Sequence, residues 1–251
     1  MYERRPDNYD RWGIGYQQTR REDPRLARQI HAALGAARTV VNVGAGAGSY
    51  EPKRLNVIAV EPSEVMIVQR PRDAAPVVRA VAEALPFADG SFDAGMALWT
   101  IHHWSDLDRG LAELRRVARR VVVVAIEASV MNRLWLTRDY WPGMARDRRP
   151  EIEPEMVVAK LGGQTRIEPM LIPRDCVDGF GEAYWARPEA YLGAHIRVGM
   201  SCFQRLEPTE LEEGLGRLDA DLRSGAWDAR HGSLRHMDEL DCGHRLVIAD
   251  V

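Results

Sequence analysis

The chain is poor in cysteine and in lysine. Cys176, Cys202 and Cys242 are widely spaced and form no CxxC pair, so the pattern gives no reason to expect disulfides or a zinc site. Of the 34 basic residues only Lys53 and Lys160 are lysine. We interpret this bias toward arginine as an imprint of GC-rich coding. From the cysteine pattern, we expect no bound metal.

The sequence also lacks long apolar runs and a strong excess of either charge. No apolar run approaches the roughly 18 residues of a membrane span, and the first residues lack the apolar core of a signal peptide. We therefore expect a cytoplasmic protein without a membrane partner. The net charge of -3, with no basic run, disfavours nucleic acid as a partner. The 251 residues, 45% of them hydrophobic, suffice for one large α/β domain. We expect the protein to be a monomer or a homodimer.

An apolar run, residues 40–43, leads into a glycine-rich loop that holds Gly44, Gly46 and Gly48. This pattern is typical of a buried parallel strand that ends where the backbone approaches a ligand closely. A dinucleotide fingerprint would place glycine at position 49, where Ser49 stands. The next predicted strand, residues 56–61, ends in Glu61, and an acid there can accept hydrogen bonds from ribose hydroxyls. The pattern thus predicts a nucleoside-binding βαβ unit.

Strands and helices are predicted to alternate through residue 126. The spacing predicts strands over residues 38–43, 56–61, 77–81, 92–98 and 121–126, and helices that begin at Pro24, Ser63 and Ser105. This order implies an α/β fold with a doubly wound, mostly parallel sheet. Ligands of such sheets bind beyond the carboxyl ends of the strands, where the glycine loop, Glu61, residues 82–83 and residues 98–103 all fall.

Three further segments complete the predicted organisation. We expect residues 1–23 to form a helical arm or lid, and residues 24–178 together with 240–251 to form a cofactor-binding core. A helix over 155–161 and strands over 168–173 and 244–250 are predicted within this core. The intervening residues 179–239 are too long for a turn, so we expect a helical cap over the substrate site.

Five short motifs resemble those of one enzyme family. They are residues 40–48 (VVNVGAGAG), 60–63 (VEPS), 82–87 (AEALPF), 91–93 (SFD) and 101–104 (IHHW). In this order they look like the motifs of class I S-adenosylmethionine-dependent methyltransferases. They are most similar to the type 11 branch, which includes ubiquinone- and menaquinone-biosynthesis-like enzymes. The resemblance covers residues 38–126 and implies a seven-stranded Rossmann-like sheet with a reversed last strand.

The resemblance also implies roles in binding S-adenosylmethionine and its product S-adenosylhomocysteine. Different residues would contact the methionine part, the ribose, the adenine, the sulfonium and the carboxylate end. In that order they are Gly44, Ala45 and Gly46; Glu61 and Pro62; Ala82 and Glu83; Leu98 and Trp99; and Tyr16 with Arg20 or Arg21.

The chain departs from this family at two positions. An acid is usual where Asn42 stands, and a carboxylate there favours the cofactor's ammonium group. Neutral Asn42 can still accept a hydrogen bond, but a charged acceptor would bind roughly twice as strongly. Many relatives also carry an acid, which reads the adenine amine, where Val81 stands; Glu83 is the replacement we expect.

Histidines and aromatic residues are the candidates for chemistry and substrate binding. His102 and His103 lie at a predicted strand end, where a histidine could act as a base near neutral pH, or could shape the pocket through loop hydrogen bonds. The second group could stack on a substrate, close over it, or simply form a hydrophobic core. Its members are Tyr9 in the arm and Tyr184, Trp185, Tyr191 and His195 in the cap.

We therefore predict a methyltransferase that modifies oxygen, nitrogen or carbon of a small organic molecule. A tRNA-modifying enzyme is the alternative within the class, for which a cluster of arginines between residues 138 and 149 is the one hint. A non-catalytic binding or regulatory protein with this fold is the second alternative. A nicotinamide-dependent oxidoreductase is the third, and Ser49 weighs against it.

Overall fold

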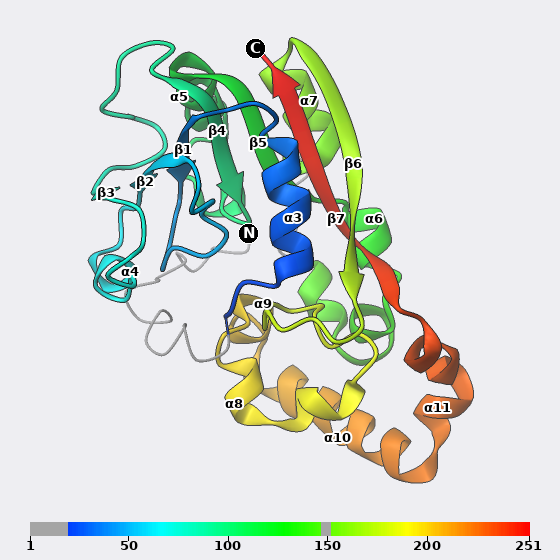
Figure 1. The fold of residues 1–251 in the computed structure, drawn as a ribbon. Coiled ribbons are helices and arrows are strands. Elements are labelled where there is room, and N and C mark those ends of the chain that lie inside the picture. The colour runs from blue at the N-terminus through cyan, green and yellow to red at the C-terminus, as the bar shows by residue number, and fades with distance from the viewer. Residues whose placement is uncertain (1–19, 147–151) are drawn as a thin grey trace.

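The computed structural model describes residues 20–146 and 152–251, so Tyr9 and Tyr16 lie outside the described residues (Figure 1). Seven strands form one sheet in the order β3-β2-β1-β4-β5-β7-β6. They are β1 (Thr39–Val43), β2 (Asn56–Val60), β3 (Val77–Val78), β4 (Phe92–Leu98), β5 (Ala118–Ile126), β6 (Gln164–Pro173) and β7 (Glu239–Asp250).

The sheet is parallel except at its end. β1 pairs with β2 and β4 in parallel, as does β2 with β3 and β4 with β5, whereas β7 runs antiparallel to both β5 and β6. The predicted mostly parallel, seven-stranded α/β fold with a reversed last strand is therefore confirmed.

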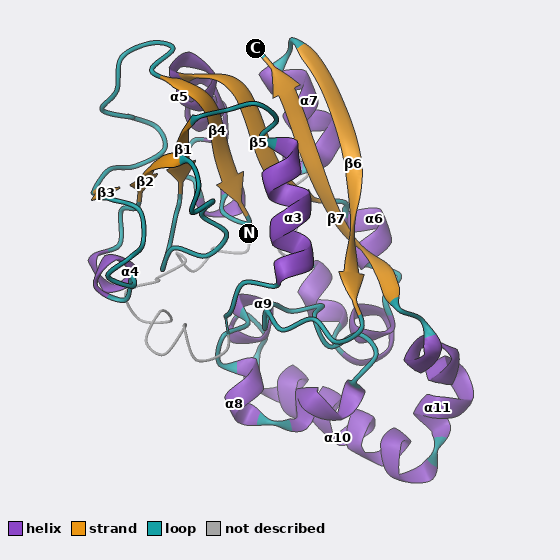
Figure 2. Cartoon of the chain, viewed as in Figure 1, coloured by secondary structure: helices purple, strands orange, loops and turns teal. Residues whose placement is uncertain are grey.

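Helices cover both faces of the sheet (Figure 2). One face of the sheet is covered by α3 (Pro24–Ala33), whose Leu26 and Ile30 side chains are buried against one set of strand side chains. The opposite face is covered by α5 (Leu107–Val117) and α7 (Pro154–Leu161), whose apolar sides pack against the alternate strand positions. Two hydrophobic cores thus enclose the central strands, as their continuous apolar sequences require.

Local sequence sets where these helices begin and end. Asp23 accepts a hydrogen bond from the Arg25 backbone N–H, and Pro24 fits the first turn because its missing N–H needs no partner there. Asp106 caps α5 in the same way, through the Arg109 N–H. α7 ends at Gly162, whose φ of 62° favours glycine.

The residues predicted to form the cap, 179–239, connect β6 to β7 and form a group of short helices around one long one, and the last of them, Glu239, already belongs to β7. The helices are η5 (Pro188–Leu192), α8 (Ala194–Arg197), α9 (Ser201–Gln204), α10 (Pro208–Ser224), α11 (Ala226–His231) and η6 (Gly232–His236). Figure 1 shows them beyond the end of the sheet toward which β4 points.

The cap packs on a segment that follows β5 and that the sequence analysis left unassigned. This segment contains α6 (Ala128–Met131), a π-helical turn η2 (Leu136–Tyr140) and η3 (Pro142–Ala145). Trp135, Tyr140 and Trp141 from it join Tyr191 and Trp227 of the cap in a separate hydrophobic core. The cap core is therefore built from two stretches of sequence.

Some strand bounds differ from the predicted ones. β3 is confined to Val77–Val78, so the prediction of a strand over 77–81 was too long. β6 and β7 both begin earlier than predicted. The start of β6 was missed because its first half is largely solvent-exposed and gives only a weak hydrophobic pattern. Within the described ranges, no helix has both the length and the apolar character that a bilayer span needs.

Candidate active site

A cavity of about 400 Å³ opens where β1, β2 and β4 end. Every predicted cofactor residue within the described ranges contributes to its wall, except Arg21, the alternative to Arg20. These residues are Arg20, Asn42, Gly44, Ala45, Gly46, Glu61, Pro62, Ala82, Glu83, Leu98 and Trp99. Residues from five separate parts of the sequence thus converge at one sheet edge, as the topology of a parallel sheet predicts.

The glycine loop has a backbone that side chains would disturb. Gly44 has φ of 72°, and a Cβ there would lie 2.0 Å from Oγ1 of Thr100. Its N–H and that of Ala45 both donate to the carbonyl of Val60, at 2.9 and 3.0 Å. The requirement for glycine at position 44 therefore comes from packing against Thr100 as well as from the turn.

Glu61 links β2 to the glycine loop. One carboxylate oxygen accepts from the Gly46 N–H at 2.8 Å, and the other accepts from the Ser63 N–H at 2.9 Å. Ser63 in turn caps α4 (Glu64–Val68) through the Met66 N–H. The carboxylate is thus held at the cavity wall by backbone donors, which fix its orientation.

Asn42 is almost fully buried, at 2% exposure, where β1 meets the cavity. Its side-chain Nδ2 donates to Oε1 of Glu51 at 3.2 Å. Glu51 is ion-paired with Arg70 at 2.7 Å, and both side chains are buried. The residue at the position of the family's usual acid therefore neighbours a carboxylate from another part of the chain.

Glu83 turns its carboxylate toward the loop before α5. Oε1 accepts from the Ser105 N–H at 2.7 Å, from the Ser105 hydroxyl at 2.8 Å and from the Asp106 N–H at 3.1 Å. Burial opposes its ionisation, but the hydrogen bonds from Asp106 and Ser105 outweigh this and lower the pKa of Glu83. Val81, 46% exposed, and buried Ala82 line the same stretch of wall.

Trp99 follows the last residue of β4 and has φ of 51°, an unusual value for a residue with a side chain. Its ring lies 5.3 Å from that of Tyr50 and stacks on Phe180 at 5.8 Å, between ring centroids. Its indole Nε1 donates to His244 at 2.8 Å. The surroundings thus hold Trp99 in one orientation at the cavity.

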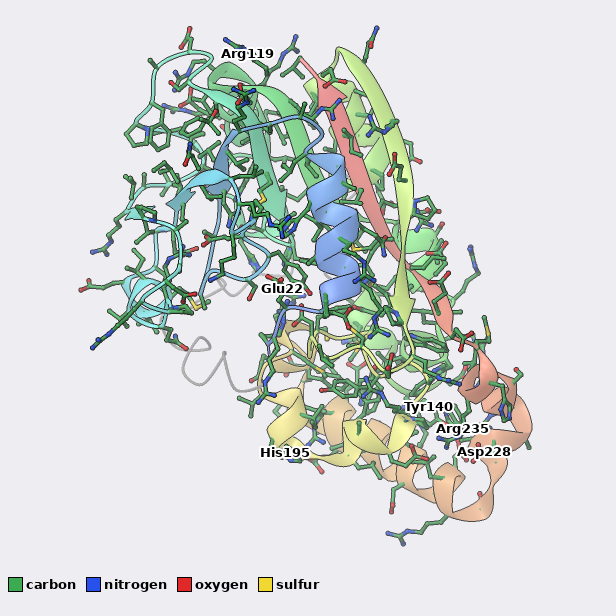
Figure 3. All side chains as sticks on the ribbon, in the orientation of Figure 1. Glu22, Arg119, Tyr140, His195, Asp228 and Arg235 are labelled. Carbon is green, nitrogen blue, oxygen red and sulfur yellow. The ribbon has the colours of Figure 1, made fainter. Side chains whose placement is uncertain are left out.

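Arg20 brings the start of the described chain to the cavity. Its guanidinium pairs with the buried Asp178 at 2.6 Å, and Asp178 also accepts from the Tyr50 hydroxyl at 2.8 Å. Burial and the Asp178 charge raise the pKa of Tyr50. Tyr50 also donates its N–H to Glu22 at 2.9 Å, and Figure 3 places Glu22 between the glycine loop and α3.

The two candidate catalytic histidines lie together in a 3-10 turn, η1 (Ile101–His103). Their ring centroids are 3.8 Å apart. His103 lines the cavity whereas His102 does not. The structure therefore distinguishes the two candidates, which the sequence alone could not do. Trp104 and Ser105, which follow them, also line the cavity.

The cap aromatics lie elsewhere. Trp185 and Tyr191 are buried, and their polar atoms are bonded to the carbonyls of Ile172 at 3.0 Å and Gly181 at 2.7 Å. Tyr184 stacks beneath the Arg187 guanidinium, and His195 is an exposed residue of α8 (Figure 3). None of the four lines the cavity, so Trp185 and Tyr191 match the hydrophobic-core interpretation of these aromatics.

The sequence analysis missed several residues of the wall. Tyr50 and Ser49 directly continue the glycine loop, and Trp104 stands in the histidine motif, so proximity along the chain was a usable signal. Thr100 follows β4, but its contact with Gly44 joins positions 56 residues apart and left no local pattern.

The three cysteines do not line the cavity. All three thiols are free, and burial raises the pKa of Cys176 and of Cys202 to about 12. Over residues 20–146 and 152–251, no three histidine, cysteine or acidic side chains are grouped to hold a metal ion.

Comparison with known proteins identifies the family of this chain. The type 11 family model described as a methyltransferase domain matches residues 41–126. The uncharacterized protein YafE of Escherichia coli (strain K12) is 36% identical over 63 residues, which is 24% of this chain and 28% of that protein. The chain therefore matches under a third of this curated relative.

Solved structures that match nearly the whole chain include the following two. One, from Anaeromyxobacter dehalogenans and assigned as a type II methyltransferase, is 24% identical with a TM-score of 0.51, over 92% of this chain and 95% of that chain. It supports the fold.

The other comes from Anabaena variabilis ATCC 29413 and is assigned as a methyltransferase from an antibiotic biosynthesis pathway. It is 31% identical to this chain, covers 93% of it and 100% of its own length, and has a TM-score of 0.85. With the family-model match and the ordered motifs around the cavity, this similarity shows that the chain belongs to the class I S-adenosylmethionine-dependent methyltransferases, type 11.

Proposed function

We propose that this protein binds S-adenosylmethionine in the cavity and transfers its methyl group to a small organic molecule. The observation that carries this proposal is the convergence of the cofactor candidates from five stretches of sequence on one cavity. The family membership supports the class of reaction, and the residues of this chain support its details.

The cavity residues fit the cofactor chemically. Glu61 presents a fixed carboxylate to ribose hydroxyls, and the loop from Gly44 to Gly46 leaves room for the backbone to approach the methionine part. Ala82 and Val81 provide an apolar edge for adenine. Because the Glu83 carboxylate is directed to Ser105 and Asp106, its part at this edge is to shape the loop.

The amino-acid end requires an acceptor for its ammonium group and a cation for its carboxylate. Asn42 supplies the first and Arg20 the second, at the edge of the cavity near the ends of β1 and β4. Arg20 is already paired with Asp178, which keeps the guanidinium in place before a ligand arrives.

Bound S-adenosylmethionine supplies an electrophilic methyl group on a positively charged sulfur. Leu98 and the ring of Trp99 line the cavity and would exclude water from that sulfur. Holding the acceptor in line with the methyl group, about 3 Å away, would be the main way in which the protein lowers the barrier to transfer. When the acceptor must lose a proton, His103 is the cavity residue that can take it near neutral pH.

The acceptor is proposed to enter between the cavity and the cap. Asp178, the residue before the cap, contacts Tyr50, and Phe180 of the cap stacks on Trp99, so the start of the cap reaches the cavity wall directly. The Anabaena variabilis relative's assignment to an antibiotic biosynthesis pathway favours a small-molecule acceptor over tRNA.

The test is to incubate the protein with methyl-labelled S-adenosylmethionine and either small hydroxylated and aminated aromatic compounds or bulk tRNA. We expect label in the small-molecule fraction, and none with a Glu61→Ala variant. Label that enters only tRNA would overturn the small-molecule proposal, and binding without transfer to any acceptor would favour the non-catalytic alternative.

A further inference from the structure

Behind the cavity wall, a buried ion pair contacts Asn42, the neutral residue that stands where an acid is usual. We infer that Glu51 is a positioning residue for the amino-acid end of the cofactor, because it fixes Asn42 as a hydrogen-bond acceptor. This inference rests on the proposed binding of S-adenosylmethionine in the cavity. It concerns how strongly that one end of the cofactor is held.

The contacts around Glu51 use both of its carboxylate oxygens. Oε1 accepts from Asn42 Nδ2 at 3.2 Å and from Arg70 Nη2 at 2.7 Å. Oε2 accepts from Arg70 Nη2 at 2.9 Å and from the Ala75 N–H at 3.0 Å. Arg70 also donates to the carbonyl of Gly46 at 3.2 Å, so the pair lies directly beneath the glycine loop.

This arrangement determines which atom Asn42 offers to a ligand. With its amide reversed, the Asn42 carbonyl would face the Glu51 carboxylate, acceptor against acceptor. Glu51 therefore binds Nδ2 of Asn42. The carbonyl Oδ1 is then the Asn42 atom that can accept a hydrogen bond from a ligand. Asn42 lines the cavity whereas Glu51 and Arg70 do not, so an acceptor is presented to the ligand without a charge.

The same geometry explains why an acid does not suit position 42 in this chain. An aspartate there would lie about as far from Glu51 as Nδ2 does, 3.2 Å, with Arg70 as the neighbouring cation. Two buried carboxylates at that separation disfavour each other's ionised form. The residues at positions 42 and 51 are therefore coupled, and an ionised carboxylate is favourable at one of the two positions but not at both.

A charge swap tests this coupling. In Asn42→Asp combined with Glu51→Gln, the side-chain amide nitrogen introduced at position 51 takes the place of Oε1 and can donate to the new carboxylate, while the amide oxygen takes the place of Oε2 and accepts from Arg70 and Ala75. Arg70 Nη2, which lies 2.7 Å from Oε1 in the wild type, must then shift toward that oxygen, because an amide nitrogen cannot accept from it. Net charge is unchanged, but the carboxylate now faces the cavity. The probes are S-adenosylhomocysteine, which has the amino-acid end, and 5′-methylthioadenosine, which lacks it, both titrated calorimetrically.

We expect the swap to bind S-adenosylhomocysteine about fivefold more tightly than the wild type, because the acceptor becomes charged. Asn42→Leu should bind it about fivefold more weakly, because the acceptor is lost. Neither variant should change the affinity for 5′-methylthioadenosine. Asn42→Asp alone should lower the melting temperature, and the swap should restore it.

Two results would overturn the inference in different ways. Wild-type protein that binds both probes, with an affinity ratio that neither variant alters, would leave the cofactor site intact and remove Asn42 and Glu51 from recognition of the amino-acid end. Wild-type protein that binds neither probe would remove the cofactor assignment itself, and this inference with it.

Discussion

The indole Nε1 of Trp99 donates a hydrogen bond to Nδ1 of His244 over 2.8 Å, across the strand that separates β4 from β7. Because an indole N–H can only donate, this bond requires an unprotonated Nδ1. The other ring nitrogen lies 3.4 Å from a Glu182 carboxylate oxygen in the cap. A chain of polar contacts therefore joins the cavity wall to the last strand and to the cap.

Replacement of Trp99 by phenylalanine should destabilise the protein. His244 is 1% exposed, so loss of its donor leaves a buried nitrogen without a partner. We expect the free energy of unfolding to fall by about 1–3 kcal/mol, measured by urea denaturation. In a His244→Leu background the same substitution should cost much less, and an equal cost in both backgrounds would contradict this account of the bond.

Gly44→Ala should be far more harmful than Gly90→Ala. Both glycines have positive φ, 72° and 60°, but a Cβ at Gly90 would have nothing within 4 Å, whereas one at Gly44 would collide with Thr100. The Gly90 variant therefore measures the backbone strain alone, about 1 kcal/mol. Thermal denaturation should show a clearly larger loss for Gly44→Ala. Similar losses would mean that Thr100 moves aside easily.

Asp23 should contribute stability that disappears in acid. Its side chain is fully buried; burial opposes ionisation, but hydrogen bonds from Arg25 and Val177 outweigh this and lower its pKa from 3.8 to about 2. A lowered folded-state pKa means that the stabilisation, about 2 kcal/mol, is complete above pH 4 and is lost as the pH falls toward 2.

The measurement is the free energy of unfolding of Asp23→Asn and wild type between pH 7 and pH 3. The difference between them should shrink as the pH falls. Asp73→Asn, which removes an exposed carboxylate paired with Lys53, is the control and should change little at either pH. A pH-independent difference for Asp23→Asn would show that its charge does not stabilise the fold.

His103→Ala should reduce turnover more than His102→Ala, because His103 lines the cavity. For an acceptor that must lose a proton, we expect kcat to fall by about 10²- to 10⁴-fold. The affinity for S-adenosylhomocysteine should stay unchanged, which separates a catalytic role from damage to the cofactor site. Equal turnover of both variants would remove His103 from the mechanism.

The sequence predicted well those parts of the fold whose signals are local. The apolar run before Gly44 and the acid at Glu61 each sit at a strand end, and parallel strands bring their carboxyl ends to one edge. Strand β4 was predicted with its observed bounds because turns flank a short, buried run. Order along the chain was therefore enough to predict that these residues lie at one cavity.

Contacts between distant segments could not be predicted in the same way. Asp178 meets Arg20 and Tyr50 across 158 and 128 residues, and nothing near any of them marks the others as partners. The cap core depends on Trp135 and Trp141, which come from a segment without a clear helical period. Aromatic residues in the cap looked the same whether they faced a substrate or a core.

The most direct test of the central claim is a calorimetric titration of S-adenosylhomocysteine into the wild-type protein and into Glu61→Ala, with NAD as the control ligand. The account predicts micromolar binding to the wild type, loss of that binding in the variant, and no binding of NAD. Wild-type protein that does not bind S-adenosylhomocysteine, or a variant that binds it as tightly as the wild type, would contradict it.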